Sequence, residues 1–441
     1  MTRTLTAKSK RWIRRILFAL VPLAVLWGAA SLVLHLLEEK KVISTYRQDD
    51  VVTAPVYVTQ VKSGDPEHLV FFNKYANVET LLTKKKTANS LRFFVLGESF
   101  AQGAPYTAMG PGRPQYGDIT NWLKAILELR FPSKTIEAVN AGVSGINSFG
   151  VVEIVKDVLP LQPDFIVIVQ GNNEGYLTPQ INLELQKWIV YRALKKGLLR
   201  EPNPAERPEF MQQQNKPAEV EQAYRDNYRR IVDLAAAQGV RVVLSTMPIN
   251  LKFDGNSVPW NGSQWTPDEP MRKGDTLFRQ GRYREALQSY QQSQVRFFKD
   301  LFVGNCLEAL GEYDAAMKLY RDMAQREPWG RARPSFNDFF RRISREKSNV
   351  TLADAERAYL ASDPHGMPNP KLFLDNCHMH WRGYLLVARA MAQTIVESRL
   401  VTGTPGEPLP EPTLEQMIEK YHWTFFTKPE SEQVLPPPPI Q

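Results

Sequence analysis

The sequence predicts an α/β protein with a doubly wound parallel sheet, a small inserted α-helical region and an N-terminal transmembrane helix. Short apolar runs of strand length alternate with longer stretches of helical periodicity between residues 91 and 250. Strands and helices that alternate in this way form a parallel sheet with helices on both faces. An uncharged run near the N-terminus and a repeated pattern within residues 270–328 indicate the other two parts.

The first element is the apolar run from Ile16 to Leu37, which as a helix is about 33 Å long and can span a bilayer. Six basic residues and no acidic residue precede it. The positive-inside rule therefore predicts a cytoplasmic N-terminus (1–15), a single-pass anchor (16–37) in the plasma or inner membrane, and an extracytoplasmic remainder. A cleaved signal peptide is the alternative, but this run exceeds the usual 7–15 apolar residues, and Gly28, Ala29 and Ala30 lie inside it.

The net charge of +8 comes mainly from this basic flank. The rest of the chain is nearly neutral and lacks the excess of positive charge that is typical of nucleic-acid-binding proteins. The two cysteines, Cys306 and Cys377, could oxidise in an exported domain. Two widely spaced cysteines do not make a disulfide framework, and each could instead be a small buried apolar residue.

Residues 38–90 are expected to form a stalk or edge segment, with a strand-like alternation from Val51 to Val61. The α/β domain is expected to occupy residues 91–265 and 333–400. Its predicted strands are Leu91–Leu96, Ile136–Val139, Phe165–Val169, Val240–Leu244 and Val350–Ala353. Its predicted helices are Tyr116–Arg130, Val151–Leu159, Leu183–Leu198, Val220–Gln238 and Trp381–Leu400. Residues 401–441 are proline-rich and are expected to be extended or disordered.

Residues 266–332 contain an internal repeat that is inserted into the α/β domain. The recurring residues are Gly274, Gly281, Ala286 and Tyr290, and then Gly304, Gly311, Ala316 and Tyr320. Their offsets resemble the tetratricopeptide pattern, although the copies are 30 residues apart against the usual 34. Because two repeats rarely form an independent solenoid, we expect them to pack on the α/β domain, with recruitment of a protein partner as the alternative.

Ser99 follows the first predicted strand in the sequence Gly97-Glu98-Ser99, so it should lie at the carboxyl end of the sheet, where open α/β sheets place their sites. This is not the nucleophile elbow of α/β-hydrolases, because Ala101 stands where that motif needs glycine. The alternative is a serine that caps the next helix.

Two more loops follow predicted strands. In Asn140–Gly145, the backbone at Gly142 can approach a ligand closely and offer its N–H. A phosphate-binding loop is the alternative, but its Gly-Lys-Ser/Thr element is missing. In Gly171–Glu174, the side chain of Asn173 can donate a hydrogen bond to a developing oxyanion, or it can simply form an Asx turn.

The last motif places Asp375 three residues before His378. A serine hydroxyl needs an adjacent base, histidine titrates near neutral pH, and a carboxylate fixes the tautomer of the imidazole. A metal site is the alternative because Cys377 and His380 lie beside this pair. No distant ligand pair of suitable spacing completes such a site.

In this order, the four motifs resemble those of the GDSL/SGNH hydrolase family, over about residues 91–180, 220–250 and 345–395. The resemblance implies an α/β/α serine esterase without cofactor or metal. Ser99 would be the nucleophile, and Asp375 and His378 would complete the triad. The N–H groups of Ser99 and Gly142 and the amide of Asn173 would form the oxyanion hole.

The sequence departs from the family at several positions. Glu98 and Glu174 stand where the family has aspartate, and Met379-His380 replaces the common Pro-Thr, which makes His380 a rival base. The spacing from Asp375 favours His378.

Resemblance and predicted location together imply a membrane-anchored, periplasmic esterase for carboxylic esters, with acetylated envelope polysaccharide as the expected substrate. The alternatives are an O-acyltransferase with the same triad and a non-catalytic scaffold that binds a protein through the helical repeats. No nucleic-acid partner is expected.

Overall fold

The structure is a computed structural model of the chain. It describes residues 7–39, 57–61, 67–73, 78–106, 117–174, 185, 188–198, 217–254, 267–295, 299–326, 330–403 and 405–406. The chain forms two compact units, Met1–Ala54 with Thr178–Arg207, and Pro55–Leu177 with Pro208–Gln441. The first six residues, the strand-like run before residue 57, Pro328 and the proline-rich tail beyond residue 406 lie outside the described residues.

The larger unit is built on a five-stranded parallel sheet with the order β5-β4-β6-β7-β8. Its strands are β4 (Ser90–Gly97), β5 (Thr135–Gly142), β6 (Phe165–Val169), β7 (Arg241–Ser245) and β8 (Val350–Ala353). All residues of β4 and β6 are buried, as expected for strands covered on both faces. The predicted doubly wound sheet is therefore confirmed, and the predicted strands at 165–169 and 350–353 agree to the residue.

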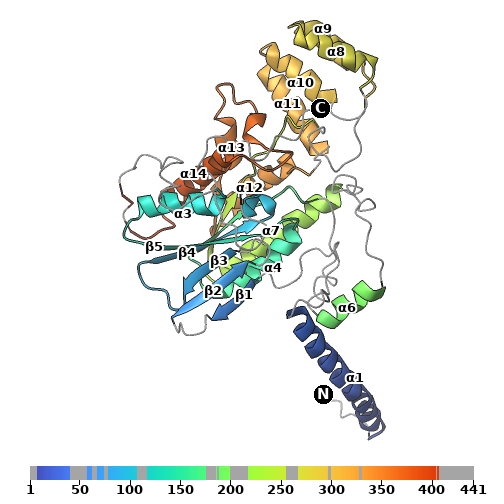
Figure 1. Cartoon of the computed structure of the whole chain (residues 1–441), viewed down its shortest axis with the longest axis vertical. Coiled ribbons are helices and arrows are strands. Elements are labelled where there is room, and N and C mark those ends of the chain that lie inside the picture. The colour runs from blue at the N-terminus through green and yellow to red at the C-terminus, as the bar shows by residue number, and fades with distance from the viewer. Residues whose placement is uncertain are drawn as a thin grey trace. The chain divides into compact units, whose positions relative to one another are not determined.

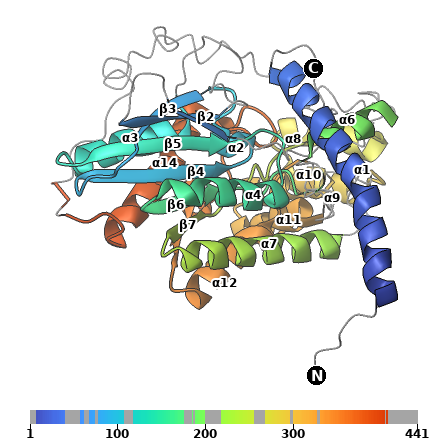
Figure 2. The same ribbon diagram turned by 90° about the horizontal axis from the view of Figure 1, so that it is seen from below.

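Helices cover both faces of this sheet (Figures 1 and 2). One face carries α3 (Ile119–Arg130) and α14 (Trp381–Glu397). The other face carries α4 (Ser148–Val158), α7 (Pro217–Ala237) and α12 (Pro334–Glu346). The sequence interpretation missed α12 and the short α13 (Ala355–Leu360). Helix α12 buries Phe336, Phe339, Phe340 and Ile343 on one side, which is the spacing of an amphipathic helix.

Within residues 38–90, the described part folds as a three-stranded antiparallel sheet. It consists of β1 (Tyr57–Val61), β2 (His68–Asn73) and β3 (Val78–Thr83). The Glu137 carboxylate on β5 accepts hydrogen bonds from the N–H and the hydroxyl of Thr83, both at 2.7 Å, and from Arg92 Nε at 2.6 Å. The hydrogen bonds of Thr83 to this buried ion pair join β3 to the main sheet, so strands β1–β3 belong to the same folded unit as the α/β domain.

The insertion forms two helical hairpins, α8 (Glu269–Arg279) with α9 (Tyr283–Gln292), and α10 (Lys299–Ala309) with α11 (Tyr313–Arg326). In both hairpins a glycine of the first helix packs closely against a tyrosine ring of the second. A Cβ on Gly274 would lie 2.5 Å from the Tyr290 ring, and one on Gly304 would lie 2.5 Å from the Tyr320 ring. Ala316, Tyr320, Met323 and Ala324 of α11 belong to the main hydrophobic core. The second hairpin therefore packs on the α/β domain.

The smaller unit contains α1 (Ala7–Glu39) and α6 (Ile189–Leu198). Residues Leu20–Leu37 of α1 have a mean hydropathy of 2.1, so this helix is long and apolar enough to cross a membrane. The rings of Trp27 on α1 and Trp188 before α6 meet edge to face at 5.7 Å.

Candidate active site

Ser99 lies at the carboxyl edge of the sheet, directly beyond β4. The strand order reverses there between β4 and β6, and this is where doubly wound folds place their ligands. Gly97 has φ +148°, and a Cβ on it would lie 2.0 Å from the carbonyl oxygen of Val169. Glycine is therefore required for the turn that ends β4 and begins the short helix α2 (Ser99–Gln102).

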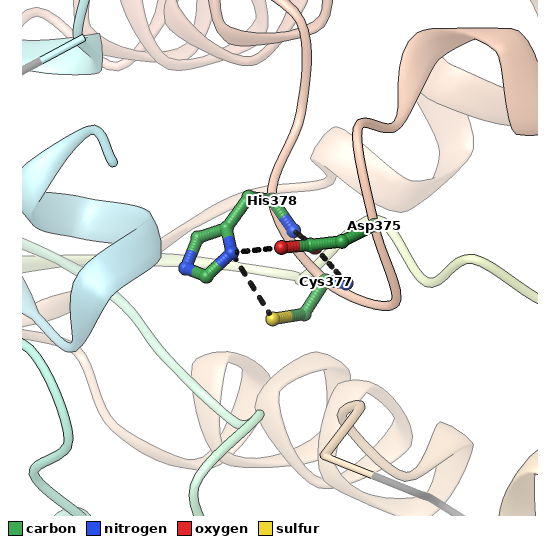
Figure 3. Close-up of side chains that lie close together, drawn as sticks. All are labelled: Asp375, Cys377 and His378. Atoms are coloured by element: carbon green, nitrogen blue, oxygen red, sulfur yellow. Dashed lines mark hydrogen bonds and ion pairs between the residues drawn. The ribbon is translucent and has the colours of Figure 1, made fainter. Parts of the chain in front are cut away.

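The loop before α14 brings His378 and Asp375 to this serine, although they lie far away in the sequence. His378 Nε2 lies 2.8 Å from Ser99 Oγ, and His378 Nδ1 lies 2.7 Å from Asp375 Oδ2. The other carboxylate oxygen of Asp375 accepts the backbone N–H groups of Cys377 (2.8 Å) and His378 (2.6 Å). The separation of three residues thus produces a tight loop in which the carboxylate contacts both the backbone and the ring (Figure 3).

Asp375 is electrostatically suited to hold the imidazole. Burial alone would raise the pKa of its carboxyl. The hydrogen bonds from the His378 ring and from the two N–H groups outweigh burial, so this pKa lies below its usual range. An ionised Asp375 accepts a hydrogen bond from the Nδ1–H of His378, and the Nε2 lone pair then faces the hydroxyl of Ser99.

His380 occupies another place. Its Nδ1 lies 3.5 Å from the hydroxyl of Tyr106, and the residue stands at the N-cap of α14. The geometry thus favours His378 as the base, in agreement with the spacing from Asp375.

Asn173 lies beyond β6, on the loop beside β4. Its side-chain Nδ2 is buried and has no hydrogen-bond partner in the structure. A buried amide donor without an acceptor is costly, so this N–H is free to bind an acceptor oxygen that a ligand supplies.

Glu98, the residue before Ser99, braces the Asn173 loop. Its carboxylate is fully buried and accepts hydrogen bonds from the N–H of Gly171 at 3.1 Å and from Asn172 Nδ2 at 2.8 Å. Burial, with the nearby Glu174 as a smaller cause, raises the pKa of Glu98 to about 8 against the opposing effect of these donors. The sequence showed Glu98 as a departure from the family but not as a brace, because its partners lie more than 70 residues away.

Glu174 holds the far end of the same loop. Its carboxylate accepts hydrogen bonds from the N–H and hydroxyl of Ser148 at the start of α4, and from Gln170 Nε2 at 2.8 Å. Burial raises the pKa of Glu174 to about 7. Two buried glutamates thus fix the loop that carries Asn173.

Gly142 differs from its predicted role. Its N–H donates a hydrogen bond to Asn140 Oδ1 at 3.0 Å, and a Cβ on it would lie 2.2 Å from the backbone nitrogen of Gln102. This glycine is thus needed for close packing against α2, and its geometry does not support an oxyanion role. The sequence interpretation passed over Gly145 in the same loop, which has φ +79° and open space beside its Cα.

A metal is the other chemistry that the site residues suggest. The ligand atoms of Asp375, Cys377 and His378 lie within 4.8 Å of one another. However, a metal between these atoms would replace the hydrogen bond from His378 Nδ1 to Asp375 Oδ2. The residues therefore fit a proton relay better than a metal site.

No protein-family model and no curated protein matches this sequence. Among solved structures, the chain is similar to a GDSL-like lipase from Bacteroides thetaiotaomicron (13% identity, TM-score 0.35, covering 72% of this chain and 93% of that one). It is also similar to a catalytic mutant of an acetylxylan esterase from Geobacillus stearothermophilus (15%, 0.32, 71% and 96%). A third is an alpha/beta hydrolase from the metagenome of Lake Arreo, Spain (15%, 0.33, 69% and 94%).

Proposed function

We propose that this protein is a membrane-anchored serine esterase that hydrolyses carboxylic esters, with Ser99, His378 and Asp375 as its triad. The observation that carries the proposal is the continuous hydrogen-bonded chain from Ser99 Oγ through the His378 ring to Asp375. The unpartnered Nδ2 of Asn173 on the neighbouring loop supports the proposal, because such a site needs a hydrogen-bond donor for the oxyanion.

The proposed reaction has two steps. His378 Nε2 takes the proton of Ser99 as Oγ attacks the ester carbonyl carbon, and the resulting oxyanion is held by the N–H of Ser99 and by Asn173 Nδ2. Ser99 begins α2, so its N–H has no acceptor within that helix. The tetrahedral intermediate collapses, and the alcohol leaves with the proton from His378. Water then attacks the acyl-Ser99 while His378 takes its proton. As the bond from the acyl carbon to Oγ breaks, His378 returns that proton to Oγ and the acid is released.

The proposed cell-envelope setting rests on the apolar span Leu20–Leu37 of α1, which is preceded by basic residues and would leave the larger unit outside the membrane. An acetylated polysaccharide of the periplasm or envelope is the proposed substrate. The helical repeats are proposed to serve mainly the fold, because the second hairpin contributes to the main core.

The test is hydrolysis of p-nitrophenyl acetate by the full chain in detergent micelles, wild type beside Ser99→Ala. We expect the variant to lose at least about 1,000-fold in kcat. Ser344→Ala on α12 is the matched control, since its hydroxyl only bonds the carbonyl of Arg341 within the helix. A Ser99→Ala enzyme that keeps a tenth of the activity would refute the assignment. Turnover that appears only when a sugar acceptor is added would identify an O-acyltransferase.

A further inference from the structure

The chain segment between the helical insertion and α12, residues 330–332, contacts both sides of the candidate active site. We call it the strap. Two of its residues are almost completely buried, with Arg331 2% and Ala332 0% exposed, and Gly330 is half-buried. In the sequence it directly follows the second hairpin, and no residue in it belongs to the motifs that suggested the site.

On the oxyanion side, the strap holds the residues that precede Asn173. The N–H of Ala332 donates to Asn172 Oδ1 at 2.9 Å, while Asn172 Nδ2 donates to Glu98 beside Ser99. A Cβ on Gly171 would lie 2.8 Å from the Cβ of Ala332, so the two backbones pack as closely as glycine allows.

On the base side, the strap holds the residues beside Asp375. Asn376 Nδ2 donates to the carbonyl oxygen of Gly330 at 3.0 Å. Gly330 has φ +69°, and a Cβ there would lie 2.7 Å from that same Nδ2, so only glycine allows this contact.

Arg331 makes a second connection to the base side. Its Nη1 donates to the carbonyl oxygen of Asn250 at 2.7 Å, and Asn250 Nδ2 donates to the carbonyl oxygen of Asp375 at 2.9 Å. The guanidinium also lies over the Phe253 ring, 5.3 Å from its centroid. A buried arginine whose guanidinium both donates a hydrogen bond and lies over an aromatic ring forms a rigid support for the loop that carries Asp375 and His378.

From these contacts we infer that the strap fixes the separation between the oxyanion donor Asn173 and the base His378, with Arg331 as its main positioning residue. This inference rests on the proposed triad. A displacement of about 1 Å between reacting groups can cost about 100-fold in rate, so buried supports of this kind affect turnover without touching the substrate.

A double-mutant cycle on the full chain tests the inference. Asn172→Ala removes the contact on the oxyanion side, and Asn376→Ala removes the one on the base side. Asn349→Ala is the matched control, because its amide also donates to a backbone carbonyl, that of Val232, at 3.0 Å. We expect each of the first two variants to lower kcat for p-nitrophenyl acetate about tenfold, with KM within about threefold and the urea midpoint close to that of the control.

The cycle separates a coupled strap from two independent loops. If the strap couples them, the double variant should lose clearly less than the product of the two single losses, by about threefold or more. Multiplying losses would show that the loops are held separately, and they would overturn the inference. Unchanged kcat in both single variants, with wild-type turnover still dependent on Ser99, would also overturn it.

Variants of Arg331 give a second test, which does not depend on whether the Asn172 and Asn376 variants fold. Arg331→Met keeps the apolar stem but loses the bond to Asn250, and should lower kcat at least about tenfold. Arg331→Lys restores one donor and should recover most of that loss. Equal losses in both folded variants would contradict a positioning role. If wild type itself lacks Ser99-dependent turnover, the proposed function fails and not the strap.

Discussion

The carboxylate of Glu98 and the side-chain amide of Asn172 are joined by a 2.8 Å hydrogen bond, which links the residue before Ser99 to the residue before Asn173. The orientation of the amide is fixed, because its oxygen accepts the N–H of Ala332. Together with the hydrogen bond from the N–H of Gly171 to Glu98, this contact holds the loop of Ser99 and the loop of Asn173 to each other.

At a pH above the raised pKa of Glu98 of about 8, replacing Glu98 with Gln should lower kcat for p-nitrophenyl acetate by about 10- to 100-fold with little change in KM. The ionised carboxylate accepts hydrogen bonds from both Gly171 and Asn172, whereas a glutamine presents one acceptor and one donor, so one hydrogen bond is lost and the loop shifts. Glu128→Gln, in a half-buried pair with Lys124 on α3, is the control. Equal kcat in the two variants would show that Glu98 is not needed to brace Asn173.

The same buried carboxyls make stability depend on pH. Folding raises the pKa of Glu98 from 4.5 to about 8 and that of Glu174 from 4.5 to about 7. Between pH 4.5 and these raised values, the folded protein keeps protons that the unfolded chain releases. Their contribution to the free energy of unfolding therefore falls as pH rises from about 4.5 to about 8. The urea midpoint should drop more between pH 5.5 and pH 8.5 in wild type than in Glu98→Gln. Equal drops would show that Glu98 titrates near its ordinary value.

Asp375→Asn should reduce kcat by about 1,000- to 10,000-fold, because an amide can present its N–H to the ring and stabilise the wrong tautomer of His378. Cys377→Ser should keep activity within about threefold, since the thiol takes no part in the proposed reaction. Activity measured after extensive chelation completes the comparison. A large loss in Cys377→Ser or after chelation would favour the metal alternative.

The variants Gly142→Ala and Gly145→Ala distinguish a glycine needed for close packing from a glycine needed only for its backbone conformation. A methyl on Gly142 meets the backbone of Gln102, so we expect at least about 3 kcal/mol of lost stability. A methyl on Gly145 meets open space, so the only loss of stability, about 1 kcal/mol, comes from the left-handed backbone conformation of this residue. Urea unfolding measures both values. Similar stability losses would show that the close approach at Gly142 relaxes easily.

The parts that could be predicted from the sequence are those with local signals. The run at 165–169 is apolar along its whole length, and the run at 350–353 is a short sheet-type segment. Both strands form where predicted. The repeated offset between Gly274 and Tyr290, and between Gly304 and Tyr320, corresponds to a real contact within each hairpin.

The parts that could not be predicted depend on distant contacts. Strand β2 begins with His68 and ends with Asn73, and it is held through its neighbours β1 and β3 and through Phe71, which packs on Phe94. Glu98 as a brace, Gly142 as a packing residue and the strap all involve partners that only the folded chain brings near. No spacing in the sequence indicates them.

The membership of α11 in the main core has a consequence for how the protein can be divided. The boundaries at residues 266 and 332 look like those of a removable cassette, but Ala316, Tyr320 and Met323 are shared interior of the α/β domain. Excising the cassette would open that interior to water and leave the Asn172 and Asn376 side chains without their strap partners. The second hairpin is thus part of the interior of the α/β domain, and any shortened form of this protein that still folds has to keep it.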